Sequence, residues 1–219
     1  MARKRLGVLI SGRGSNMQAL IDAARAPDYP ADIAVVISNI PGAAGLERAA
    51  EAGVPVITID HKTFGKGAEA KRLFEAALNC ALEEAGVDIV CLAGFMRLLS
   101  AAFVERWYGR LVNIHPSLLP AFKGLDVHAA MLAAGVKIAG CTVHYVSAEM
   151  DAGPIIGQAA VPVLAGDSAE SLAARILLAE HQLYPECVRR VALGEAVISG
   201  GGGVLTGEAG GALLNPPPR

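Results

Sequence analysis

Residues 6–24 of the chain read Leu-Gly-Val-Leu-Ile-Ser-Gly-Arg-Gly-Ser-Asn-Met-Gln-Ala-Leu-Ile-Asp-Ala-Ala. The first five residues form an apolar run with the length of a buried strand. From Met17 onward, apolar side chains recur at i, i+3, i+4 and i+7, which is the spacing of one helix face. Between the two lies a polar turn, residues 11–16, that contains two glycines. A strand, such a turn and a helix in this order predict the first half of a βαβ unit, and hence a parallel sheet.

The rest of the chain continues this alternation of short apolar runs and helical patterns. We expect further strands at 33–37, 56–59, 89–93, 111–114, 141–146 and 155–163, and helices at 44–52, 68–85 and 168–191. The helix at 68–85 is predicted from the spacing of Leu73, Ala77, Cys80, Ala81 and Glu84. An irregular segment with several helix breakers is expected from His115 to about Val136.

These patterns predict an α/β fold: a single doubly wound domain over residues 1–199, with a mostly parallel central sheet and flanking helices. Residues 200–219 are rich in glycine and proline and are predicted to be a disordered or loosely packed tail.

Composition limits the classes of function. With 53% hydrophobic and 18% charged residues, the chain has ample apolar surface to bury and is not expected to be disordered. A net charge of −2 argues against nucleic acid or an anionic membrane as a partner. The longest apolar stretch, 87–99, is interrupted by Asp88 and Arg97, so no membrane span is predicted. The four cysteines form no C-x-x-C pair and are interpreted as free thiols, and the protein is expected to be cytoplasmic.

The turn at residues 11–16 is a candidate phosphate site. Glycines let the backbone approach an anion, and the N–H groups and dipole of the following helix favour negative charge. A dinucleotide fingerprint would place a third glycine where Met17 stands, and a Walker loop would need Gly-Lys-Ser/Thr before the helix. The alternative is that Ser15 or Asn16 only caps the helix.

Asn113 and His115 form the candidate catalytic pair. They stand two residues apart on a predicted strand, so their side chains share one face, at the end where ligands bind in open α/β sheets. An amide N–H stabilises a developing oxyanion, and an imidazole moves protons near neutral pH. Asp151 lies in a turn between two late strands, where a carboxylate beside His115 would favour the charged ring. The alternatives are a polar strand end satisfied by the backbone and an ordinary turn aspartate.

A resemblance brings these residues together. The motif Asn113-Ile114-His115-Pro116-Ser117-Leu118-Leu119-Pro120, with Asp151-Ala152-Gly153 downstream, resembles the signature of the folate-dependent formyltransferases. Gly12-Arg13-Gly14-Ser15-Asn16 and Leu92-Ala93-Gly94-Phe95-Met96-Arg97 narrow the match to the phosphoribosylglycinamide formyltransferase family. The resemblance runs from about Leu6 to about Ile198 and implies a Rossmann-like formyltransferase fold.

The resemblance implies formyl transfer from 10-formyltetrahydrofolate to the amine of 5′-phosphoribosylglycinamide in purine biosynthesis. Asn113 would bind the oxyanion, His115 would act as general acid, and Asp151 would be its charge partner and proton relay. Both substrates are small molecules, the folate is a co-substrate, and neither a metal nor a covalent intermediate is implied. The protein is expected to be a monomer or a homodimer.

The resemblance also assigns binding residues. The ribose phosphate would be held by Gly14, Ser15 and Asn16, and the ribose hydroxyls by Glu180, which from sequence alone is an ordinary solvated helix charge. The folate would contact Met96, Arg97, Leu98, Leu99, Val104, Asn113, Ser147, Ala148, Glu149, Met150 and Asp151. His144 is interpreted as either a further catalytic group or a structural histidine.

One position departs from the family. An arginine that contacts the folate often follows the phenylalanine equivalent to Phe64, and here that position is Gly67. Lys66 offers a point charge nearby, although an ammonium cannot reproduce the fork of a guanidinium.

Three other functions stay open at the level of the sequence. Formyltetrahydrofolate hydrolase and methionyl-tRNA formyltransferase share the Asn-His-Asp core, but the first carries an N-terminal regulatory domain and the second a larger C-terminal domain. A phosphate-sensing module without catalysis would keep the first loop only. We also hypothesise that the loop from Ala121 to Val136 closes over substrate.

Overall fold

The computed structural model describes residues 2–198 and 204–206, which fall into two compact units, the first ending at Val112 and the second beginning at Asn113. The elements of the first unit are β1 (Lys4–Ile10), α1 (Ser15–Ala24), β2 (Ala31–Ser38), α2 (Ala44–Glu51), β3 (Val56–Thr58), the 3₁₀ helix η1 (His61–Phe64), α3 (Ala68–Glu84), β4 (Ile89–Leu92) and α4 (Ala101–Arg106). Strand β5 (Leu111–His115) crosses the boundary. The second unit continues with α5 (Val127–Ala133), β6 (Ile138–Tyr145), β7 (Ile155–Pro162), α6 (Ala169–Leu193), β8 (Ala196–Ile198) and β9 (Val204–Thr206).

The strands confirm the predicted α/β class. In the described part of the chain, seven strands form a sheet in the order β3-β2-β1-β4-β5-β6-β7. The pairs β1–β2, β1–β4 and β2–β3 are parallel, whereas β6–β7 is antiparallel, so the sheet is mostly parallel as expected. Strands β1 and β4 are buried over nearly their whole length, which is why they read as continuous apolar runs.

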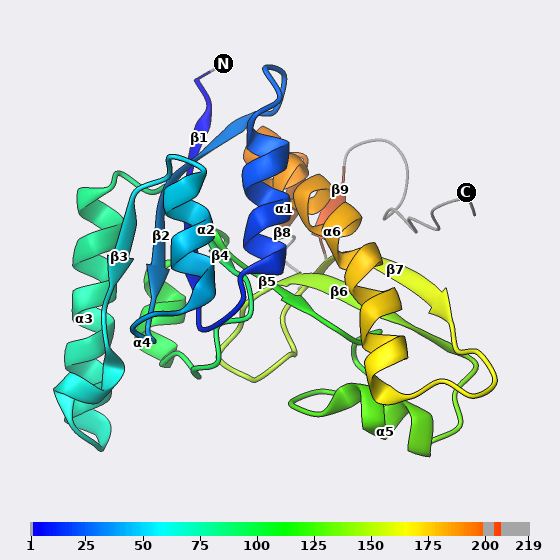
Figure 1. Ribbon diagram of the computed structural model, residues 1–219. Coiled ribbons are helices and arrows are strands. Elements are labelled where there is room, and N and C mark those ends of the chain that lie inside the picture. The colour runs from blue at the N-terminus through cyan, green and yellow to red at the C-terminus, as the bar shows by residue number, and fades with distance from the viewer. Residues whose placement is uncertain (1, 199–203, 207–219) are drawn as a thin grey trace. The chain divides into compact units, whose positions relative to one another are not determined.

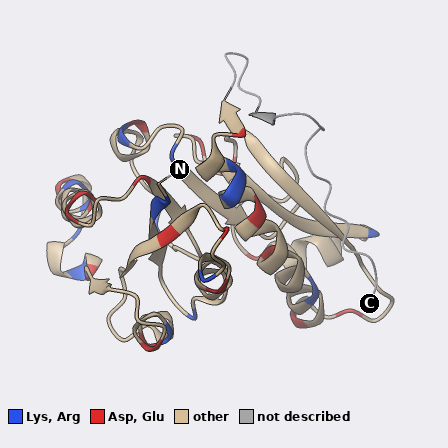
Figure 2. Ribbon diagram, turned by 90° about the horizontal axis from the view of Figure 1, so that it is seen from above, with Lys and Arg blue, Asp and Glu red and all other residues tan. Residues whose placement is uncertain are grey.

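Helices cover the strands within each unit. In the first unit, α1 and α2 pack side by side against β2 (Figure 1). In the second, α6 lies along β6 and β7, and α5 packs against α6 (Figure 1). Basic and acidic residues occur together on the helices (Figure 2), in agreement with the nearly neutral net charge. None of the helices in residues 2–198 is long and apolar enough to cross a membrane.

Three sequence expectations need correction or completion. The segment predicted to be irregular up to Val136 contains α5, whose Val127 and Met131 are spaced i, i+4 and are both buried. The short helices η1 and α4 were not predicted, because four to six residues show little periodicity. Helix α3 is confirmed, but the spacing that predicted it does not mark its buried face.

The buried face of α3 follows its bulky residues. Two residues of the predicted stripe are on the outside, because Leu73 is 42% exposed and Cys80 is exposed. The bulky residues Phe74 and Leu78, which lie on another stripe of the helix, are buried. Because alanines occur on both faces of α3, the apolar spacing fits two alternative helix faces. The face with the larger apolar side chains is the one that packs against the protein. Of the predicted tail, residues 200–203 and 207–219 lie outside the described residues, and 204–206 form β9, paired antiparallel with β8.

Candidate active site

The second unit brings the three predicted catalytic residues into one cluster. Asn113 and His115 project from β5, and Asp151 lies in the turn between β6 and β7. Nδ1 of His115 lies 3.6 Å from Oδ2 of Asp151, and the two side chains are 7% and 12% exposed. The carboxylate therefore faces the imidazole in a nearly buried setting, where the attraction between opposite charges is weakly screened.

The other ring nitrogen of His115 is hydrogen-bonded to the backbone. Nε2 lies 2.9 Å from the carbonyl oxygen of Phe122, and a carbonyl only accepts hydrogen bonds, so Nε2 carries a proton. Nδ1 is then the nitrogen that faces Asp151, at a distance too long for a hydrogen bond. Nδ1 is thus the ring atom whose protonation can change while the bond of Nε2 to Phe122 is kept.

The backbone around Asp151 is built to hold its carboxylate. Asp151 has φ of 49°, in the left-handed region that costs a residue with a side chain about 1 kcal/mol or more. The N–H of Gly124 donates to Oδ2 of Asp151 at 2.9 Å. Gly153 permits the tight turn, because a Cβ there would lie 1.7 Å from the carbonyl oxygen of Tyr145.

His144 joins the cluster as a neutral ring. Its Nδ1 lies 2.9 Å from the carbonyl oxygen of Tyr145, so Nδ1 carries the proton. Its Nε2 accepts from Nδ2 of Asn113 at 3.2 Å and lies 3.9 Å from Oδ1 of Asp151. Burial lowers the pKa of His144, against the opposing effects of the Tyr145 carbonyl and the Asp151 charge. The β6–β7 register shifts between Val143 and His144, an irregularity of the kind that re-aims side chains near functional sites.

In the first unit, the loop before α1 has the geometry of an anion site. Helix α1 begins at Ser15, and its N-cap is Gly14 with φ of 70°, a residue that has no side chain to cap the helix. The N-cap position is therefore neither Ser15 nor Asn16. A Cβ on Gly14 would lie 2.9 Å from Cα of Gly45, so both the conformation and the space require glycine.

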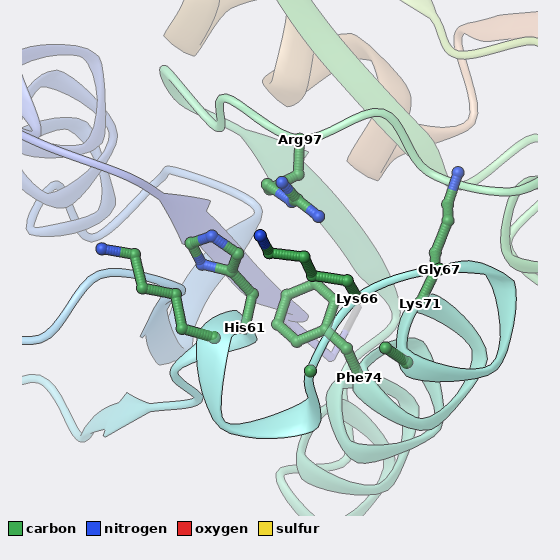
Figure 3. A pocket seen from close by; sticks show the side chains of 9 residues that line it. His61, Lys66, Gly67, Lys71, Phe74 and Arg97 are labelled. Carbon is green, nitrogen blue, oxygen red and sulfur yellow. The ribbon is translucent and has the colours of Figure 1, made fainter.

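A basic pocket lies next to η1 and α3. Its volume is about 570 Å³, and it is lined by His61, Lys62, Gly65, Lys66, Gly67, Ala70, Lys71, Phe74 and Arg97. Figure 3 shows His61, Lys66 and Arg97 around the ring of Phe74. The ring is buried, whereas Lys66 and Arg97 are exposed, so the pocket combines an apolar ring with solvent-exposed positive charges. Gly67 lines this pocket, so the position of the missing family arginine is here.

The predicted folate segment 96–99 is fixed at both ends. The N–H of Met96 donates to Oγ of Ser11 at 2.8 Å, and the buried carboxylate of Glu75 accepts from the N–H of Ser100 at 2.7 Å. Between these anchors, Met96 and Leu98 are 67% and 68% exposed, which leaves apolar surface open to a flat ring. Val104, on α4, is buried instead.

Glu180 is buried in α6, with 5% of its surface exposed. It is therefore not the solvated helix charge that the sequence alone suggested. A carboxylate is kept in such a place only with polar partners, which makes it a stronger candidate for a binding residue.

Sequence reasoning missed two backbone groups that hold the predicted catalytic side chains. The carbonyl of Phe122 fixes His115, and the N–H of Gly124 fixes Asp151. Backbone groups leave no residue-type signal. The positive φ of Gly124 explains only why a glycine stands at that position. Within residues 2–198 and 204–206, no group of three or more His, Cys, Asp or Glu side chains has the arrangement of a metal site.

The chain is similar in sequence to a known protein family. Residues 4–188 match the model of the family described as formyl transferase. The chain belongs to the formyl transferase family. Phosphoribosylglycinamide formyltransferase of Escherichia coli (strain K12) is 45% identical over 178 residues, which are 81% of this chain and 82% of that protein. The crystal structure of phosphoribosylglycinamide formyltransferase from Anaplasma phagocytophilum matches with a TM-score of 0.87 and 47% identity, over 96% of this chain and 98% of that chain.

Some relatives are much longer than this chain. The trifunctional purine biosynthetic protein adenosine-3 of Homo sapiens is 50% identical over 192 residues, which are 88% of this chain but 19% of that protein. The chain thus spans about a fifth of the length of such relatives. The resemblance to phosphoribosylglycinamide formyltransferases and the formyltransferase fold expected from the motifs are confirmed.

Proposed function

We propose that the chain transfers the formyl group of 10-formyltetrahydrofolate to the amine of 5′-phosphoribosylglycinamide, a step of purine biosynthesis. The observation that carries this proposal is the buried cluster of Asn113, His115 and Asp151, in a chain whose relatives are named for this reaction. An amide donor, an imidazole and a carboxylate around one point are suited to acyl transfer through a tetrahedral intermediate.

The chemistry starts with attack of the glycinamide nitrogen on the formyl carbon. The formyl oxygen gains negative charge, and Asn113 stabilises it, because its amide has two N–H groups and only one is used by His144. In its charged form His115 carries a proton on each ring nitrogen, and it donates the one on Nδ1 to N10 of the folate. The bond from the formyl carbon to N10 breaks as N10 takes up that proton.

Asp151 completes the proton balance. The attacking amine must lose one proton while N10 gains one. The reaction therefore needs a group that relays the proton, and no proton is consumed overall. Asp151 lies 3.6 Å from Nδ1 of His115 and 3.9 Å from Nε2 of His144, and it serves as charge partner and relay. His144 orients Asn113 as an acceptor and stays neutral.

Binding residues are proposed for each substrate. The N–H groups at the start of α1, with Gly14, Ser15 and Asn16, bind the ribose phosphate, and the buried Glu180 accepts from the ribose hydroxyls. The pterin ring is bound by the folate segment assigned above and by residues 147–151. The basic pocket beside η1 binds the glutamate carboxylates of the folate, with the Lys66 ammonium and the Arg97 guanidinium in place of the arginine missing at Gly67.

The test is a comparison of formyl acceptors. Purified protein is incubated with 10-formyltetrahydrofolate and with phosphoribosylglycinamide, initiator methionyl-tRNA or no acceptor, and the release of tetrahydrofolate is followed. We expect turnover only with phosphoribosylglycinamide. Equal turnover without acceptor would point to a hydrolase, turnover with the tRNA to a tRNA enzyme, and none in any arm to a binding module. Cytoplasmic location and a monomeric or homodimeric state stay predictions.

A further inference from the structure

We propose that Ser117 is a positioning residue for His115 and that it acts through the carbonyl group of Phe122. The inference rests on the proposed function, because it concerns how the general acid of that reaction is held. Ser117 follows His115 by two residues, within the motif that begins at Asn113, and is completely buried. The chemistry proposed above gives it no role.

The contacts of Ser117 define the link. Its Oγ lies 2.7 Å from the carbonyl oxygen of Ala121 and 3.0 Å from that of Phe122. A hydroxyl has a single proton, which therefore lies between two carbonyl oxygens that can only accept. The Phe122 oxygen is the same atom that accepts from Nε2 of His115 at 2.9 Å. One carbonyl oxygen thus joins the serine hydroxyl to the imidazole.

Ser117 is itself fixed to two strands. Its carbonyl oxygen accepts from Oγ1 of Thr142, on β6, at 2.7 Å. Oγ1 of Thr142 in turn accepts from the N–H of Leu119 at 3.0 Å and from Nε2 of Gln158, on β7, at 3.0 Å. Thr142 is completely buried, so these bonds do not compete with solvent. The turn that carries the serine is therefore held rigidly against the sheet.

Phe122 needs such support, because its φ is 54°, in the left-handed region that a side chain disfavours. The hydroxyl of Ser117 offsets part of this cost and directs the carbonyl toward the ring. The carbonyl in turn fixes the proton of the neutral ring on Nε2, which leaves Nδ1 toward Asp151. Without the hydroxyl, the carbonyl is free to turn, and the neutral ring can take the other tautomer, with its proton on Nδ1 directed at the carboxylate.

The consequence is kinetic rather than a matter of binding. A loosely held general acid spends less time in the reactive geometry, which lowers kcat. The substrates do not touch the buried hydroxyl, so their KM values should stay nearly unchanged. A purely structural serine would change stability alone.

The experiment compares Ser117→Ala with Ser38→Ala in the chain of residues 1–219. The control also removes one completely buried serine hydroxyl, which donates to the carbonyl oxygen of Ile40 at 2.9 Å and lies on β2, in the first unit. The chain has five histidines, so ¹⁵N-histidine labelling gives a small set of ring signals whose shifts distinguish the two tautomers. The His115 signals are assigned by their loss in His115→Asn, and steady-state kinetics and thermal unfolding are measured in parallel.

We expect Ser117→Ala to lower kcat about tenfold with both KM values within about twofold of wild type, and to show a mixture of the two tautomers of the neutral His115 ring. Ser38→Ala should unfold at a lower temperature but keep the wild-type rate and the Nε2–H tautomer of His115. An unchanged rate and tautomer in Ser117→Ala would overturn the proposal.

Two further arms keep the test decisive. If Ser117→Ala does not fold, Ser117→Cys keeps the volume with a weak S–H donor, and a wild-type tautomer in that variant would count against the proposal. If the wild-type protein transfers no formyl group, the proposed function fails, whereas the tautomer of His115 still reports on Ser117.

Discussion

The loop before α1 and the cluster on β5 are both built from short motifs, but they differ in burial and in the groups that they present. The loop offers backbone N–H groups at a helix start, and the basic pocket of the same unit offers exposed lysine and arginine side chains. The cluster offers side chains that are nearly buried and bonded to one another. The comparison separates an exposed candidate binding region in the first unit from a nearly buried cluster in the second, to which the proposed chemistry is assigned.

This division follows from how water acts on charges. Exposed cations are well solvated and attract anionic substrates without being rigid. Proton transfer and oxyanion stabilisation need fixed donors in a site where charges are weakly screened. Substitutions in the two regions should therefore affect different kinetic constants.

The largest expected effect is on kcat, in Asn113→Ala. Loss of the oxyanion donor should lower kcat by about 10²- to 10³-fold, with little change in either KM. Steady-state formyl transfer measures both constants. Asn79→Ala is the matched control, because Asn79 also makes a side-chain hydrogen bond, to Nε1 of Trp107 at 2.8 Å, but lies on α3. Equal losses of kcat in the two variants would mean that the amide of Asn113 has no special role.

The next effect is on the KM for phosphoribosylglycinamide, in Gly14→Ala. The added Cβ would lie 2.9 Å from Cα of Gly45, near the start of α2, and would displace the N–H groups at the start of α1. We therefore expect the KM for phosphoribosylglycinamide to rise at least about tenfold, with kcat less affected. Gly109→Ala shares the positive φ, here 69°, but has open space around its Cβ. It should lose stability and keep its KM. If both variants keep the wild-type KM, the loop does not bind the phosphate.

A smaller effect is expected on the KM for the folate, in Lys66→Ala. Removing one exposed charge from the basic pocket should raise that KM by about three- to tenfold at low salt and by less at high salt, because exposed charges are screened. Lys137→Ala, at an exposed position before β6, is the control and should change nothing. A salt-independent KM in wild type would remove the basis for assigning the folate carboxylates to this pocket.

How far the sequence predicted this arrangement depended on the range of the contacts. The strands, the long helices and the pairing of Asn113 with His115 on one face follow from local periodicity, and they could be predicted. The approach of Asp151 to within 3.6 Å of His115 bridges 36 residues and could not be read from periodicity, so it came from the family resemblance alone.

Other features were beyond sequence reasoning because they depend on tertiary packing. Glu180 looks like a solvated charge until its burial is seen, and α5 is too short for its two buried residues to form a pattern. The bonds from Phe122 and Gly124 use backbone atoms, which any residue type would provide.

The smallest expected effect is on stability, in His144→Gln. The pKa of His144 is lowered in the folded protein, so below the ordinary histidine value of 6.5 the unfolded chain takes up a proton that the folded chain refuses. The stability is complete above that pH and falls as the pH drops, by less than about 1.4 kcal/mol per pH unit for this group.

Glutamine keeps an acceptor for Asn113 but does not titrate. Urea unfolding between pH 5 and pH 8 should therefore show a shallower pH dependence in His144→Gln than in wild type. The pKa values of His128 and His181 are also lowered by burial, but these residues are present in both proteins and cancel in the difference. Parallel curves for the two proteins would show that His144 is protonated equally in both states.

The central claim is that His115 and Asp151 act as one unit, and a double-mutant cycle on kcat tests it most directly. His115→Ala, Asp151→Asn and the double variant are compared with wild type under saturating substrates. Because the second substitution removes the partner of a group already lost, the double variant should be about as slow as the slower single variant. A double variant whose loss equals the product of the two single losses would show that the residues act independently and would contradict the account.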